Sequence, residues 1–303
     1  DNMLILKFCQ LFFYFFSKKG GLVMQKRYAV IGHPLGHTMS PFIHSRLFAL
    51  SSVDAVYEAI PTPPENLSQT INLLKEYDGF NITIPHKTAV LPFLNDITPE
   101  GRLYGAVNTV KVQGGKLIGH STDAEGFACA LSLADIPIQG SVLILGCGGA
   151  SRTIATECAK RGLDITLAVR QSSMQKGLTL AKELEAQFGK KVPCTDILSP
   201  MGSFSLAVNG IPVGMHPNPD ASPLTADQLK NIDFVFDAVY NPEDTLLIKT
   251  AAALNKKAVS GMGMLVMQAV AAHKFWYGAT FSDSDIALII KDANDEMRRL
   301  FND

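Results

Sequence analysis

The segment GFNITIPHK, which ends in Lys87, carries polar side chains at a spacing that suits chemistry. The pattern predicts a strand over 79–84, on which Asn81 and Thr83 are two residues apart and face the same side of the sheet. A proline then favours the start of a helix, predicted over 85–94. Lys87 would lie in the first turn of that helix, where the helix dipole disfavours a cation. For a lone lysine, a solvated charge at a helix start is the favoured alternative. The polar segments that accompany it make the Lys87 ammonium a candidate for proton transfer instead.

Three other segments add polar side chains that could join this lysine in one site. Thr38 and Ser40 stand at a predicted helix start, a place that can bind a carboxylate. Asn108 contributes an amide. Asp123 contributes a carboxylate just after a predicted hairpin.

A glycine-rich turn, GCGGAS, runs from Gly146 to Ser151 between a predicted buried strand and a predicted helix. Its first two glycines suit a tight turn and a close approach of a pyrophosphate to the backbone. The N-terminus of the following helix would face that anion. The turn therefore predicts a dinucleotide site. A glycine-rich turn without a ligand and a site for a methyl-donor nucleoside are the alternatives.

Arg170 follows the next predicted strand, over 165–169, at the place where cofactor choice is usually made. A cofactor with a free ribose 2′-hydroxyl usually meets Asp or Glu there. A guanidinium instead suits a 2′-phosphate by its charge and its two-pronged geometry. Arg170 therefore favours NADP over NAD, although a solvated surface arginine is the alternative and NAD stays possible.

The elements that must position these residues alternate between strands and helices in two series. The first series has strands at 27–32, 55–60 and 79–84, helices starting at 40 and spanning 64–77 and 85–94, and a hairpin of 108–112 with 116–120. The second has helices at 124–134, 150–161, 174–188, 263–277 and 284–301, and strands at 141–145, 165–169, 205–208, 234–239 and 258–260. Two such series predict an α/β protein of two domains with a cleft between them.

Composition narrows the class of partner. The chain has 303 residues, a net charge of −1 and a pI near 6.7, so neither nucleic acid nor an anionic membrane is favoured as a partner. Scattered cysteines and histidines show no metal spacing, and the thiols suit a cytosolic protein. Residues 1–23 are expected to be an upstream extension without chemistry. Their apolar run is short for a membrane span, and a membrane anchor is the alternative.

Together these segments resemble the shikimate dehydrogenase family, including its quinate-using branch. The resemblance runs from about Arg27 to the C-terminus. Further shared motifs are AVNT ending at Thr109, the Thr122-Asp123 pair, NGIPVGM starting at Asn209 and GMGMLVMQ ending at Gln268. Thr38 and the residues around Arg170 depart from the family pattern, which leaves open the choices of shikimate or quinate and of NADP or NAD.

The resemblance implies a division of the chain and a role for each site residue. Residues 24–122 and 264–303 would form the substrate-binding catalytic domain, and 123–263 a Rossmann-type, doubly wound NADP domain. Lys87 and Asp123 would flank the reacting C–O group. The substrate would also meet Thr38, Ser40, Asn81, Thr83, Asn108, Tyr240 and Gln268. The cofactor would be lined by Gly146, Gly148, Gly149, Ala150, Arg170, Ala238 and Gly261.

The implied activity is the NADP-dependent, reversible reduction of 3-dehydroshikimate to shikimate, a step towards chorismate and the aromatic amino acids, in the cytoplasm and without a metal. A homodimer is a possible assembly. An alkoxide that forms at the ketone carbon needs a nearby cation or acid, and Lys87 can provide both. The alternatives are a quinate/shikimate dehydrogenase that uses NAD, a non-catalytic NADP-binding regulator, and a methyltransferase, which would leave the lysine segment unexplained.

Overall fold

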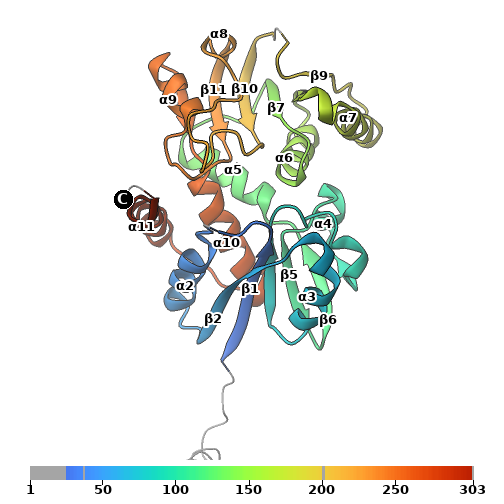
Figure 1. Cartoon of the computed structure of the whole chain (residues 1–303), viewed down its shortest axis with the longest axis vertical. Helices are drawn as coiled ribbons and strands as arrows, with labels where there is room; N and C mark the ends of the chain where they lie inside the picture. Colours follow the sequence, from blue (N-terminus) through green and yellow to red (C-terminus); the bar gives the residue numbers. More distant parts are fainter. Residues whose placement is uncertain (1–24, 37, 200–201, 302–303) are drawn as a thin grey trace, which may run out of the picture.

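The computed structural model describes residues 25–36, 38–199 and 202–301, which form two lobes, each built on one six-stranded sheet (Figure 1). The predictions for residues 1–23 lie outside the described residues. The lower sheet in Figure 1 has the order β2-β1-β3-β5-β6-β4. Its strands are β1 (Lys26–Gly32), β2 (Ala55–Pro61), β3 (Gly79–Ile82), β4 (Asp96–Ile97), β5 (Thr109–Gln113) and β6 (Lys116–His120).

The lower sheet is mixed. β1 lies between β2 and β3 and is parallel to both, whereas β5 is antiparallel to β3 and to β6. Gly114 and Gly115 close the β5–β6 hairpin with φ of 58° and 73°, a conformation that glycine adopts without strain. The predicted hairpin is thus confirmed, and it carries the chain from Asn108 to Asp123.

The upper sheet is entirely parallel, with the order β12-β11-β10-β7-β8-β9. The chain winds outward from β7 through β8 to β9 and then returns to the other side of β7. In such doubly wound sheets, ligands bind at the carboxyl ends of the strands where the winding reverses, here between β7 and β10. The strands are β7 (Ser141–Leu145), β8 (Asp164–Val169), β9 (Cys194–Asp196), β10 (Phe204–Asn209), β11 (Ile232–Asp237) and β12 (Lys257–Val259).

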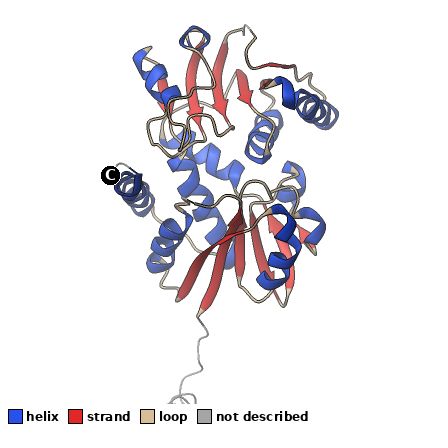
Figure 2. Cartoon of the chain, viewed as in Figure 1, coloured by secondary structure: helices blue, strands red, loops and turns tan. Residues whose placement is uncertain are grey.

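Strand alternation explains why helices cover both faces of this upper sheet (Figure 2). The helices are α2 (Ser40–Leu50), α3 (Leu67–Leu74), α4 (Pro99–Tyr104), α5 (Asp123–Leu133), α6 (Gly149–Lys160), α7 (Met174–Phe188), α8 (Ala226–Leu229), α9 (Leu246–Ala253), α10 (Met262–Tyr277) and α11 (Asp283–Phe301). Val142 and Ile144 pack with α6 and α7 on one face, whereas Leu143 and Leu145 pack with α8 and α9 on the other. The predicted α/β fold class is therefore confirmed.

Helices α5 and α10 pack against each other where the two lobes meet (Figure 1). Near its start, α10 places Met264 in the core of the upper lobe. Near its end, Trp276 packs on Tyr28 of the lower sheet and donates a hydrogen bond of 3.0 Å to the Val110 carbonyl. One helix thus anchors both lobes. Among the described residues, none of the helices has the length and apolar character needed to cross a bilayer.

The predicted helix over 85–94 is wrong. These residues form turns and a single 3₁₀ turn at Leu91–Phe93. The Lys87 carbonyl accepts a hydrogen bond of 2.8 Å from the Val107 N–H and so is not free for a helical partner. Pro92 also lacks the N–H that a helix would direct back to Thr88. Lys87 therefore lies in a turn held by the segment before β5, and no helix dipole acts on it from its own segment.

Several short elements were not predicted, namely β4, α4, β9, α8 and α9. The predicted strand over 79–84 ends at Ile82. The predicted helix over 64–77 is a 3₁₀ turn at Pro64–Asn66 followed by α3. These differences leave the two sheets intact, because the unpredicted elements lie at sheet edges or between strands.

A buried histidine pair joins α2, which begins at Ser40, to α10, which carries Gln268. His44 Nδ1 lies 2.9 Å from His273 Nε2, and His273 Nδ1 is hydrogen-bonded to the Tyr277 hydroxyl. Both imidazoles are 0% exposed. Burial lowers the pKa of His273 to about 3 and also lowers the pKa of His44, so both rings are neutral at physiological pH.

This pair predicts a loss of stability in mild acid. The folded-state pKa of each ring lies below the unfolded value, so stability is present above pH 6.5 and is lost as pH falls from there towards 3. One such histidine costs about 2 kcal/mol of unfolding free energy between pH 7 and 5. Urea unfolding at pH 7, 6 and 5 should therefore show a smaller acid loss for His273→Phe than for the wild type. Equal losses would contradict a neutral buried His273.

Candidate active site

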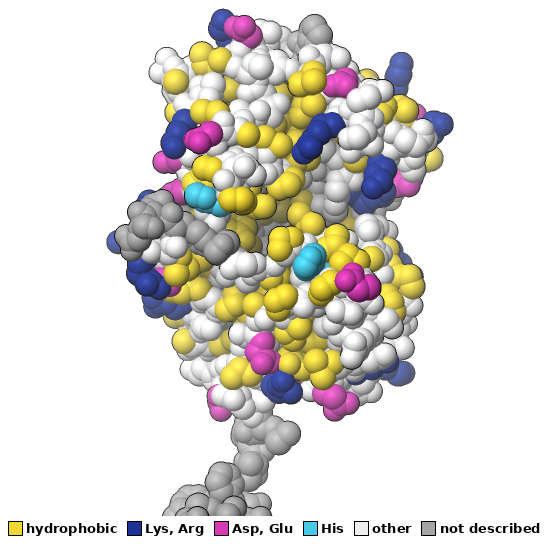
Figure 3. Space-filling view, viewed as in Figure 1, with side chains coloured by type: hydrophobic (Ala, Val, Ile, Leu, Met, Phe, Trp, Pro, Cys, Tyr) yellow, Lys and Arg dark blue, Asp and Glu magenta, His cyan; other side chains and the backbone are white. Residues whose placement is uncertain are grey.

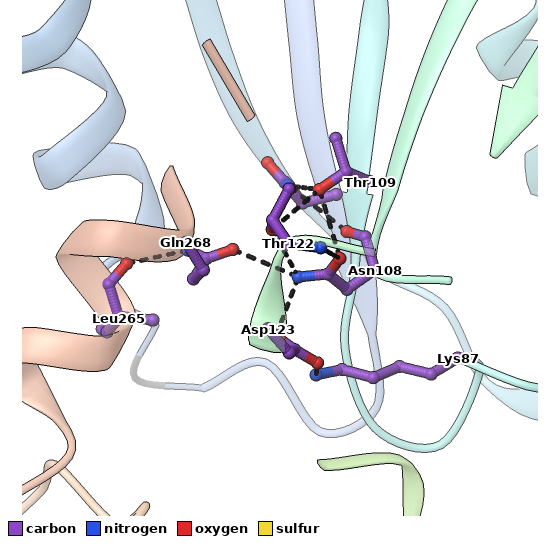
Figure 4. A network of polar contacts seen from close by, with 8 residues as sticks. Lys87, Asn108, Thr109, Thr122, Asp123, Leu265 and Gln268 are labelled. Atoms are coloured by element: carbon purple, nitrogen blue, oxygen red, sulfur yellow. Dashed lines mark hydrogen bonds and ion pairs between the residues drawn. The ribbon is translucent and has the colours of Figure 1, made fainter. Parts of the chain in front are cut away.

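Lys87 and Asp123 form an ion pair at the junction of the lobes, with Lys87 Nζ 2.5 Å from Asp123 Oδ2 (Figure 4). Their side chains are 14% and 5% exposed, so the pair is largely screened from water. Asp123 is the first residue of α5, where the helix N-terminus stabilises a carboxylate. Two segments that are far apart in the sequence thus bring the two predicted groups into contact.

Asn108 fixes the other oxygen of this carboxylate. Its Nδ2 donates to Asp123 Oδ1 at 2.8 Å and to Thr122 Oγ1 at 2.9 Å, and its Oδ1 accepts from the Thr122 N–H at 2.8 Å. Each carboxylate oxygen therefore has its own donor, the ammonium on one side and the amide on the other. Gln268 Oε1 lies 3.4 Å from the same Nδ2, while Gln268 Nε2 donates to the Leu265 carbonyl at 2.8 Å (Figure 4).

Asn81 is buried beside this network, on β3. Its Nδ2 donates to the Asn108 carbonyl at 3.2 Å and to Thr109 Oγ1 at 3.0 Å. Its Oδ1 accepts a 2.6 Å hydrogen bond from the Tyr57 hydroxyl. Both amide protons of Asn81 are thus used within the protein. Thr83, which follows β3, is half-buried, and its methyl group lies against Gly32.

A second polar group lies at the start of α2. Thr38 Oγ1 donates to Ser40 Oγ at 3.1 Å and accepts from the Ser40 N–H at 3.3 Å. The Tyr240 phenol lies against these residues: burial raises its pKa, and hydrogen bonds with the Met39 backbone and with Thr38 partly oppose the shift. Tyr240 is thus a neutral hydroxyl at physiological pH, and the three predicted carboxylate-binding side chains lie together.

The glycine turn has the conformation that a nucleotide site requires. Gly146, at the end of β7, has a φ of +99°, and a Cβ there would lie 2.3 Å from Ile211 Cγ2, so only glycine fits. At Gly148 an added Cβ would have no described heavy atom within 4 Å, which leaves the backbone open to a ligand. Helix α6 then begins at Gly149, followed by Ala150 in its first turn, and its N-terminus supplies free N–H groups for a phosphate.

The other predicted cofactor residues follow strands of the same sheet. Ala238 follows β11 and Gly261 follows β12, and an added Cβ on Gly261 would lie 2.3 Å from the Ala238 carbonyl oxygen. Arg170 follows β8 and is exposed. No hydrogen bond or ion pair engages its guanidinium within the part of the chain that the structure describes. All three therefore lie past the carboxyl ends of parallel strands, as the glycine turn does.

Other polar groups have structural roles. The Asp237 carboxylate is fully buried and accepts from Asn209 Nδ2 at 2.8 Å, from the Val239 N–H at 3.0 Å and from Thr245 Oγ1 at 2.6 Å, so it ties β11 to β10 and α9.

Burial raises the pKa of the Cys147 thiol in the glycine turn, which keeps it protonated and unreactive. Among the described residues, no three His, Cys, Asp or Glu side chains gather as a metal site would require.

Space-filling shows the molecule hollowed where the lobes meet, with many hydrophobic side chains along this waist (Figure 3). A separate cavity of about 450 Å³ lies among α4, α5, α6 and α10. Its lining includes Ser121 and Ala124, the near neighbours of Asp123, but none of the predicted site residues. Its walls carry both signs of charge, with Glu157 bound to Arg161, so it does not select a ligand of one charge.

Known proteins match this chain over most of its length. The model of the shikimate dehydrogenase substrate binding domain matches residues 30–110. The shikimate dehydrogenase (NADP(+)) of Methanocaldococcus jannaschii is 37% identical over 82% of this chain and 90% of its own. That of Methanothermobacter thermautotrophicus is 38% identical over the same shares. The crystal structure of shikimate 5-dehydrogenase from Thermus thermophilus in complex with NADP(H) and shikimate has a TM-score of 0.79 and 33% identity, covering 88% of this chain and 99% of that one. The chain belongs to the shikimate dehydrogenase family.

Proposed function

We propose that this protein catalyses the NADP-dependent, reversible reduction of 3-dehydroshikimate to shikimate, a reaction of aromatic amino-acid biosynthesis. One observation carries the proposal. The Lys87 side chain, paired with Asp123, packs against the nucleotide turn of the other lobe, since a Cβ added to Gly149 would lie 3.1 Å from Lys87 Cδ. A proton-transfer pair thus adjoins the turn that suits a dinucleotide, as a hydride-transfer enzyme requires.

The contacts support a role for each of these residues. NADP, when bound, supplies or accepts the hydride. The Lys87 ammonium stabilises the oxygen on the reacting carbon and exchanges a proton with it. Asp123 holds that ammonium in place, and Asn108 in turn holds Asp123. Thr38, Ser40 and Tyr240 would bind the substrate carboxylate. The ring hydroxyls would be met, or the residues beside them ordered, by Asn81, Thr83, Asn108 and Gln268.

The proposal also assigns a function to each of the two lobes. Residues 24–122 and 264–303 would bind substrate, and residues 123–263 would bind NADP. In support, the strands of the first sheet all precede Ser121, and those of the second all follow Gly140. Cys129, Cys147, Cys158 and Cys194 are free thiols, as is usual for proteins of a reducing compartment, and we place the protein in the cytoplasm on that ground. A homodimer is tested by the molar mass in solution.

A four-way assay tests the function. Absorbance at the nicotinamide band is followed with shikimate and with quinate, each with NADP and with NAD. We expect the highest kcat/KM with shikimate and NADP. A higher value with quinate and NAD would favour the quinate/shikimate alternative. Nucleotide binding without turnover of either acid would favour a non-catalytic regulator and would reject the proposal.

Replacing Arg170 by alanine is expected to raise the KM for NADP by about tenfold to a hundredfold, because a charged hydrogen bond contributes about 1.5–3 kcal/mol. The KM for NAD should stay nearly constant, since NAD has no 2′-phosphate. Steady-state kinetics with both cofactors measures the change. Arg102→Ala, which removes an exposed arginine paired with Asp96, is the matched control. An equal rise in the KM for NADP and for NAD would contradict a contact between Arg170 and the 2′-phosphate.

A further inference from the structure

Tyr57 on β2 lies between two groups that the proposed function assigns to different parts of the substrate. Its hydroxyl donates to Asn81 Oδ1 at 2.6 Å, on the side of the ring hydroxyls. Ser40, on the side of the carboxylate, hydrogen-bonds the same phenol oxygen; burial raises the Tyr57 pKa overall, and this contact opposes the shift. The phenol is therefore neutral, and one oxygen connects both halves of the site.

We propose that Tyr57 is a substrate-positioning residue that sets the orientation of Ser40 and Asn81 through its hydroxyl. This inference rests on the proposed function and adds a residue that the sequence motifs do not contain. Tyr57 acts through its two partners and is not itself a catalytic residue.

The ring of Tyr57 stacks on His44, one member of the buried histidine pair. Its centroid lies 4.1 Å from that of His44, with an angle of 7° between the planes, so the rings are stacked. His44 is four residues after Ser40 on α2 and therefore lies on the same face of that helix. The stack thus fixes the phenol relative to the helix that carries the Ser40 hydroxyl.

Further hydrogen bonds hold the histidine pair. Ser51 Oγ donates to the Leu47 carbonyl at 2.8 Å and lies 3.1 Å from the Tyr277 hydroxyl. That hydroxyl is hydrogen-bonded to His273 Nδ1, and His273 Nε2 is hydrogen-bonded to His44 Nδ1. The His44 ring that stacks on Tyr57 is therefore itself held by hydrogen bonds that run through His273 to Tyr277.

Loss of the phenol oxygen would affect both partners. Asn81 is 5% exposed and uses both amide protons on Asn108 and Thr109, so without Tyr57 its Oδ1 is a buried acceptor that lacks a donor. Rotation of the amide to satisfy that oxygen would break the bonds to Asn108, the residue that orients Asp123. Ser40 would at the same time lose one of its hydrogen-bond partners.

Tyr57→Phe tests the inference, because it keeps the stacked ring and removes only the hydroxyl. We expect the KM for shikimate to rise by about tenfold. This is the effect of losing one hydrogen bond that orients a site for a charged group. The KM for NADP and the thermal midpoint should stay constant, and kcat should fall by less than about threefold. Tyr77→Phe is the matched control, since its hydroxyl bonds Glu58 and Arg27 away from the site.

A double-mutant cycle with Ser40→Ala adds a readout that a merely structural role would not move. If Tyr57 acts through Ser40, the double variant should raise the KM for shikimate by less than the product of the two single effects. His273→Leu removes the hydrogen-bond partner of His44 and should raise the same KM by a smaller factor. This variant tests the inference if Tyr57→Phe fails to fold. An unchanged KM in Tyr57→Phe, or an equal rise for NADP, would overturn the inference. An inactive wild type would instead reject the proposed function.

Discussion

Replacing Lys87 by methionine is expected to lower kcat by about a hundredfold to ten-thousandfold, the range for loss of a positioned proton-transfer group with its electrostatic stabilisation. Methionine keeps an unbranched apolar stem that can pack on Gly149, so the nucleotide turn should keep its shape. The ammonium, however, is lost. In the direction of ketone reduction, the oxygen on the reacting carbon then has neither a cation beside it nor a proton donor.

The KM for NADP should change by less than about threefold, because an interaction made mainly in the transition state affects kcat rather than cofactor binding. Stopped assays in both directions, with the protein at high concentration, measure the residual rate. Lys230→Met is the matched control, since it removes a lysine that forms a 2.7 Å ion pair with Asp227 at the surface. Turnover within a factor of three of the wild type would reject the role of Lys87.

Much of the site could be predicted because its residues come from segments with local signals. A strand end places Asn81, and a hairpin carries the chain from Asn108 to Asp123. The glycine turn is typical of a nucleotide-binding site. Tyr57 could not be found in this way. Its importance depends on the register that places β2 beside β1 and on the ring of His44, a residue from another element. Strand alternation marks Tyr57 only as one of several half-buried residues.

The fold shows the same division between local and tertiary causes. Long periodic helices and strands with continuous apolar runs could be predicted, since their hydrophobic patterns are set by the local sequence. The predicted helix after Pro85 was wrong because a distant N–H, that of Val107, binds the carbonyl of Lys87. Short elements such as α8, with four residues, have too few positions to show a period. Tertiary contacts therefore decide the conformation of the segment that holds Lys87.

Replacing Asp123 by asparagine is expected to lower kcat by about a hundredfold or more, although the side chain keeps its size. The carboxylate has two acceptor oxygens, one for Lys87 Nζ and one for Asn108 Nδ2. An amide offers one oxygen and one NH₂ group, so one of these donors would face another donor. Either the lysine loses its anchor or Asn108 must rotate away from Thr122, and both outcomes displace the ammonium.

Comparison of this variant with Lys87→Met separates the two ways in which the pair can work. If Lys87 transfers the proton and Asp123 only orients it, Asp123→Asn should retain more turnover than Lys87→Met, and the double variant should match Lys87→Met alone. If the two share the proton, both single variants should lose a similar factor, because groups this close act as a unit. Asp227→Asn, the same change in an exposed ion pair, is the control. Wild-type turnover in Asp123→Asn would remove the carboxylate from the mechanism, and the 2.5 Å contact with Lys87 would then be only structural.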